Sequence, residues 1–64
     1  MSKWVRDGNK ITQIDDGTAM IYHHNNNGSY SIVLKGIKEG WERDPYPIER
    51  ESLPKELLER FPDF

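Results

Sequence analysis

Residues 18–35 read TAMIYHHNNNGSYSIVLK, two segments rich in aromatic and β-branched residues on either side of three asparagines and a glycine. Aromatic and β-branched residues favour strands, whereas Asn and Gly tolerate the positive φ angles of tight turns. The stretch therefore predicts a β-hairpin with strands at about 18–24 and 29–35.

The sequence leaves two registers open for this hairpin. A two-residue turn at 27–28 would pair Ile21 with Leu34, whereas a four-residue loop over 25–28 would pair Ile21 with Ile32. Because side chains alternate along a strand, both registers predict the same two faces. The face expected in the core carries Ala19, Ile21, His23, Tyr30, Ile32 and Leu34. The other face carries Met20, Tyr22, His24, Ser31, Val33 and Lys35.

The neighbouring histidines of this hairpin are the most conspicuous candidates for chemistry. His23 and His24 should point to opposite sides of the sheet, so they cannot easily share one metal ion. We expect His23 at the margin of the core, near Tyr30 or Ile32, and His24 toward solvent or a partner.

Catalysis finds little support in the residue pattern. Ser29 or Ser31 could be combined with His23 and an aspartate as nucleophile, base and orienting group, but no nucleophile elbow or phosphate-binding glycine loop accompanies them. The sequence predicts a protein that is not an enzyme, with no cofactor and no metal.

Two more glycine-containing turns organise the chain before residue 18. They are Asp7-Gly8-Asn9 and Asp15-Asp16-Gly17, and they bound predicted strands at about 3–6 and 10–14. The first strand is short and near a terminus, so it could fray or fail to form. We expect an antiparallel meander of three or four strands.

The second half of the chain differs in character. Residues 36–52 contain Pro45 and Pro47, which predict an extended connection, with Trp41 and Tyr46 packed at the sheet edge or exposed as a recognition strip. A helix is predicted at about 53–61, with Ser52 as its cap and Pro54 in its first turn. Glu56 and Arg60 should pair four residues apart on this helix.

These elements predict one α+β domain over residues 1–64, in which the C-terminal helix covers one sheet face. The alternative is a small SH3-like β-barrel, in which the segment around Trp41 or Ile48 adds a strand. One helix covers only one face, so an apolar patch should remain on the other. The interaction candidates are Met20, Tyr22, His24, Val33, Trp41 and Tyr46.

Composition narrows the class of function. The chain has no cysteine, no apolar run of signal-peptide or membrane-spanning length, and a net charge of −2, which predicts a soluble cytoplasmic protein. Residues 1–40 have a net charge of +1 and residues 41–64 of −3. The acidic second half could meet a basic surface on a partner.

Three functions are compatible with this pattern. The first is a small protein-binding or regulatory module, such as a phage- or mobile-element-type inhibitor or adaptor acting on a host protein. The second is nucleic-acid binding through the sheet, with bases stacked on Tyr22 or Tyr30 and phosphates bound by lysines and arginine, namely Lys3, Arg6, Lys10, Lys35 and Lys38. The third is self-assembly, for example a homodimer through an open sheet edge.

Overall fold

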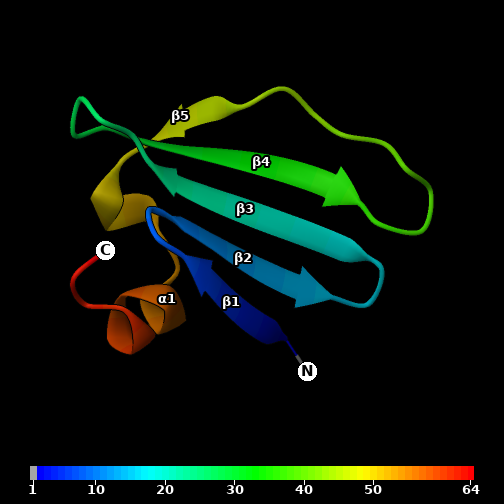
Figure 1. The fold of residues 1–64 in the computed structure, drawn as a ribbon, viewed down its shortest axis with the longest axis horizontal. Helices are drawn as coiled ribbons and strands as arrows, with labels where there is room; N and C mark the ends of the chain where they lie inside the picture. The colour runs from blue at the N-terminus through cyan, green and yellow to red at the C-terminus, as the bar shows by residue number, and fades with distance from the viewer. Residues whose placement is uncertain (1) are drawn as a thin grey trace.

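The computed structural model describes residues 2–64, which form one five-stranded antiparallel sheet and a short C-terminal helix (Figure 1). The strands follow chain order as a meander, and the sheet does not close into a barrel within the described residues. The α+β class is confirmed, and the barrel alternative is wrong. The elements are β1 (Lys3–Asp7), β2 (Lys10–Asp15), β3 (Thr18–His24), β4 (Tyr30–Gly36), β5 (Tyr46–Ile48), the 3-10 helix η1 (Arg50–Ser52) and α1 (Lys55–Arg60).

The β3–β4 hairpin has neither of the registers expected from the sequence. Tyr22 pairs with Ile32, because the loop between the strands has an odd number of residues. The N–H of Asn25 donates to the carbonyl of Ser29 at 2.8 Å. Between these two residues, the N–H of Gly28 donates to the carbonyl of Asn25, and Gly28 has a φ angle of 87°. A glycine in the left-handed region is the usual end of a three-residue hairpin loop.

This one-residue difference inverts the predicted faces of β3. Even-numbered residues of β3 share a face with Tyr30, Ile32 and Leu34, so the face expected for β4 is right and the face expected for β3 is wrong. Tyr22 consequently lies in the core with an exposed fraction of 1%. Ile21 takes the opposite, uncovered face.

The hydrophobic core lies between one sheet face and the C-terminal segment. Its buried members are Ile11, Tyr22, Tyr30, Ile32, Leu53, Leu57 and Phe64. The hydroxyl of Tyr30 donates to the main-chain oxygen of Phe64 at 2.6 Å, which ties the last residue to β4. Burial of these side chains is the main source of stability, because the chain has no disulfide.

The proline-bearing connection forms a strand that was expected only in the barrel alternative, from the segment around Trp41 or Ile48. Tyr46–Ile48 pairs with β4, and Pro47 is accommodated because β5 is an edge strand. Trp41 packs against Gly36, where a Cβ atom would lie 2.3 Å from the indole ring, but Trp41 stays partly exposed. Tyr46 has an exposed fraction of 59%, so it does not serve as core cover.

The C-terminal helix is shorter than expected. α1 begins at Lys55 with Pro54 as its N-cap, and Ser52 belongs to η1 rather than capping the helix. The predicted pair is present, with Arg60 Nε 2.9 Å from Glu56 Oε2. In residues 2–64 no helix has the length and apolarity that crossing a membrane requires.

Candidate interaction surface

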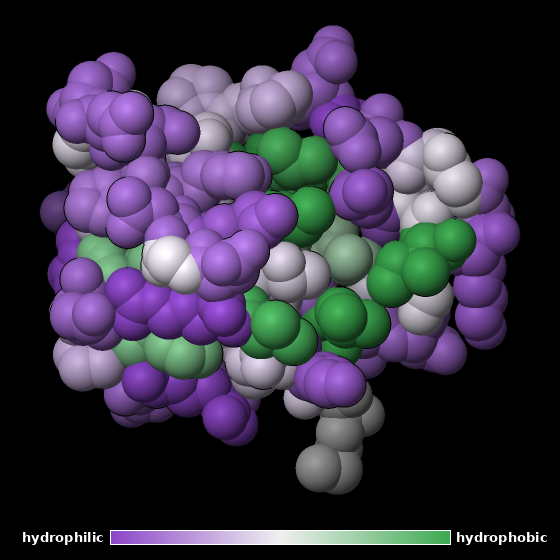
Figure 2. Space-filling view, viewed as in Figure 1, coloured by the Kyte–Doolittle hydropathy of each residue, from purple (hydrophilic) through white to green (hydrophobic). Residues whose placement is uncertain are grey.

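The sheet face opposite α1, here called the open face, carries a row of three apolar residues and one threonine across four strands. The registers align Val5 with Thr12, Thr12 with Ile21 and Ile21 with Val33. We call these residues the central row. Figure 2 shows hydrophobic surface gathered over the middle of this face, surrounded by hydrophilic residues. No helix covers it in the described part of the chain (Figure 1).

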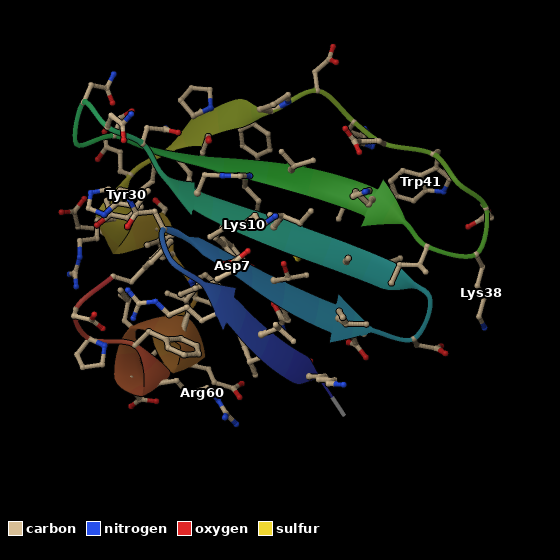
Figure 3. The ribbon with its side chains drawn as sticks, in the orientation of Figure 1. Asp7, Lys10, Tyr30, Lys38, Trp41 and Arg60 are labelled. Atoms are coloured by element: carbon tan, nitrogen blue, oxygen red, sulfur yellow. The ribbon has the colours of Figure 1, made fainter. Side chains whose placement is uncertain are left out.

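Two further rows border the central row on the open face. The first consists of Lys3, Ile14, Ala19 and Lys35, and the second of Asp7, Lys10, His23 and Ser31. Asp7 and Lys10 lie over the strands on the visible side in Figure 3, whereas Lys38 extends from the distant β4–β5 loop. Lys35 forms an ion pair with Glu42 at 3.3 Å. The charges around the central row therefore nearly balance.

The candidates predicted on the uncovered face are divided between the two faces. Val33 does lie on the open face, although only 7% of it is exposed. Met20 and Tyr22 lie on the helix-covered face, and their predicted placement is wrong for the same register reason. Tyr22 is buried, so its side chain offers no surface to a partner. Ile21, which was expected in the core, instead lies in the central row between Thr12 and Val33.

The two histidines lie on opposite faces, as expected, but with their predicted places exchanged. His24 stacks on Tyr30 with ring centroids 4.5 Å apart and contacts Phe64 edge-on at 5.9 Å. His23 lies on the open face opposite Ser31, and within residues 2–64 no hydrogen bond joins the two side chains. The described residues hold no group of three potential metal ligands. Because they lie on opposite faces of the sheet, His23 and His24 are not placed to bind one metal ion together.

A second candidate surface is an open hollow of about 620 Å³ where β4 and β5 diverge on the helix-covered face. Met20, Leu34 and Tyr46 line its apolar part, and the connection supplies Glu42, Arg43 and Asp44. The Arg43 guanidinium lies 6.0 Å from the centre of the Trp41 ring. The structure thus brings Met20, Tyr46 and the neighbourhood of Trp41 together, away from the open face.

Several carboxylates of the acidic second half are held by contacts within the chain. Glu56 accepts a hydrogen bond from the Trp4 indole at 3.0 Å, and Arg6 donates to Asp63 at 2.7 Å. The hydrogen bond from Arg6 holds the pKa of the Asp63 carboxyl below its ordinary value. These contacts join β1 to the C-terminal segment and leave less unpaired negative charge for a partner to bind.

Burial raises the pKa of the Tyr22 hydroxyl above its ordinary 10.0, and the neighbouring Tyr46 raises it further. The neutral hydroxyl is therefore favoured in the folded state. Its stabilising contribution is complete below pH 10 and is lost as the pH rises through the folded-state pKa.

We expect Tyr22→Phe to make stability less sensitive to alkaline pH. Wild type should lose more stability than the variant between about pH 9 and about pH 11. At alkaline pH the Tyr22 hydroxyl ionises more readily in the unfolded state than in the folded state, which favours unfolding of wild type only. Urea denaturation at both pH values measures the difference. An identical pH dependence of wild type and Tyr22→Phe would contradict the assignment.

No protein-family model, curated protein or solved structure matches this chain.

Proposed function

We propose that this protein is a small non-catalytic module that binds another protein through its open face, acting in the cytoplasm as an inhibitor or adaptor. The observation that carries the proposal is the central row, which no element of residues 2–64 covers. Val5, at the end of the row, has an exposed fraction of 44%. An uncovered apolar strip with a polar rim is typical of protein-binding surfaces.

The chemistry of the rim indicates what the partner surface should offer. Lys35 is already paired with the carboxylate of Glu42, but in the described residues no ion pair involves Lys3 or Lys10. A partner with an apolar centre and carboxylates at its margin would complement this arrangement. The acidic C-terminal segment is a weaker candidate for binding a basic surface, since two of its carboxylates already accept bonds from β1.

Nucleic-acid binding through the sheet receives less support from the same geometry. Tyr22 and Tyr30 are buried and cannot stack on bases. Arg6 lies on the helix-covered face with Asp63, apart from the lysines of the open face. The nearly balanced charge of the open face also provides little attraction for phosphates.

A matched pair of threonine substitutions tests the proposal. Thr12→Lys places a charge in the central row, whereas Thr18→Lys makes the same change on an exposed strand position of the opposite face. The intact protein captures its partner from a lysate, and binding of the purified partner is then measured. We expect Thr12→Lys to weaken binding about tenfold or more, since a buried charge at an interface core is costly.

The control variant and two contrary outcomes distinguish binding through the open face from the alternatives. Thr18→Lys should bind like wild type, and circular dichroism should show that both variants are folded. Equal binding by Thr12→Lys and wild type would reject the open face. Capture that is abolished by nuclease and falls steeply with added salt would instead support nucleic-acid binding.

A further inference from the structure

The two edges of the sheet differ in their ability to pair with another strand. The N–H of Gly36 donates to the carbonyl of Trp41, so even-numbered residues of β4 direct their main-chain groups toward β5. Ile32 pairs with Tyr46 on this side, which turns the next residue, Pro47, away from β4. Proline has no N–H to donate. The β5 edge is therefore protected against strand addition.

The β1 edge carries no such protection. The N–H of His24 donates to the carbonyl of Asn9 at 2.9 Å, so odd-numbered residues of β2 face β3 and even-numbered ones face β1. The partners of the even-numbered residues are the odd-numbered residues of β1. Trp4 and Arg6 thus direct their N–H and C=O groups outward, and β1 borders the sheet with no strand beyond it among the described residues (Figure 1).

We propose that two copies of this chain pair antiparallel through β1, about a two-fold axis at Val5. Hydrogen bonding requires the outward residues Trp4 and Arg6 to lie opposite outward residues of the second copy. One such register opposes Arg6 to Arg6, which is repulsive, and another opposes Trp4 to Trp4. The register centred on Val5 opposes Trp4 to Arg6 and exchanges main-chain hydrogen bonds at both pairs.

Charge favours the register centred on Val5. The strand reads KWVRD, so this register places Lys3 opposite Asp7 of the second copy at both ends. Opposite charges on facing strands are stabilising, whereas like charges are destabilising. In the register that opposes Trp4 to Trp4, Lys3 faces Val5 and this pairing is lost. The edge strand is thus complementary to itself in one alignment.

The surroundings of β1 suit it as a dimer interface. Trp4 and Arg6 are bonded to Glu56 and Asp63, which orders the edge before pairing and lowers the entropic cost. The two-fold axis is perpendicular to the sheet, so both open faces lie on the same side. Val5 then contacts Val5 of the second copy, and the two central rows join into one strip.

Charge exchange between two variants tests the interface and its register. Sedimentation equilibrium of the full chain should show a concentration-dependent dimer for wild type. Lys3→Asp and Asp7→Lys should each weaken dimerisation about tenfold or more, because each opposes like charges at both ends. A mixture of these two variants should restore pairing, since every Lys3→Asp chain then faces oppositely charged residues on an Asp7→Lys chain.

The remaining arms decide between a β1 interface and other outcomes. Lys38→Asp, an equal charge change in the β4–β5 loop, should dimerise like wild type. A wild-type protein that stays monomeric up to about 1 mM would overturn the proposal. A dimer that persists unchanged in both single variants, or a mixture that pairs no better than they do, would overturn the β1 register.

Discussion

Replacing Tyr22 by alanine should lower the free energy of unfolding by about 3–5 kcal/mol, the range for deleting a buried aromatic side chain. The Tyr22 ring is almost fully buried and stacks on Trp4 with centroids 6.4 Å apart. A chain of 64 residues has a total stability of about 3–10 kcal/mol, so this loss is a large fraction of the total and should lower the urea midpoint strongly. Urea denaturation followed by tryptophan fluorescence measures the change.

The neighbouring residue provides a matched control for this prediction. His23→Ala removes a ring from the adjacent position of β3, but on the open face, and should cost less than about 1 kcal/mol. Should Tyr22→Ala be unfolded beyond measurement, Tyr22→Leu retains apolar volume and gives a quantifiable loss. A larger loss from His23→Ala than from either Tyr22 variant would indicate the register expected from the sequence.

Replacing Phe64 by alanine should cost about 3 kcal/mol, at the low end of the range for a buried phenylalanine. The Phe64 ring lies 5.6 Å from the Tyr30 ring and 5.9 Å from the His24 ring, and it is 3% exposed. Removing it leaves a cavity beside β4. Thermal unfolding of the two proteins measures the difference.

Two comparisons separate ring packing from the hydrogen bond at this position. Tyr30→Phe keeps the ring and removes only the bond to the Phe64 main chain, so it should cost about 1 kcal/mol. Asp63→Ala changes the exposed neighbouring residue and should cost less than Phe64→Ala. If Phe64→Ala cost no more than Asp63→Ala, the last residue would not be part of the core.

Local sequence signals were sufficient for most of the secondary structure. The strands from Lys3 to Gly36 were predicted within one or two residues at each end, because Asx-Gly turns bound β-branched and aromatic runs. The pair of Glu56 and Arg60 followed from helical periodicity. The strand at 46–48 was expected only in the barrel alternative, because prolines argue against a strand unless it is known to lie at an edge.

The candidate surface was predicted less well than the elements. The presence of one helix correctly predicted an uncovered sheet face. The alternation of side chains along a strand correctly predicted that His23 and His24 lie on opposite faces. The residues of that face did not follow, since Met20 and Tyr22 belong to the other side. Both possible faces of β3 contain apolar residues, so hydropathy alone does not choose between them.

Composition and local patterning were enough to specify an α+β meander, because turn chemistry and strand propensity act over a few neighbouring residues. Tertiary structure decided the parity of the β3–β4 register. The loop closes with Gly28 in the left-handed region, and Tyr22 rather than Ile21 belongs to the buried core cluster with Leu53, Leu57 and Phe64. These contacts join residues more than thirty positions apart, so no local pattern records them. A shift of one residue in that hairpin determines which side chains are buried and which remain for a partner.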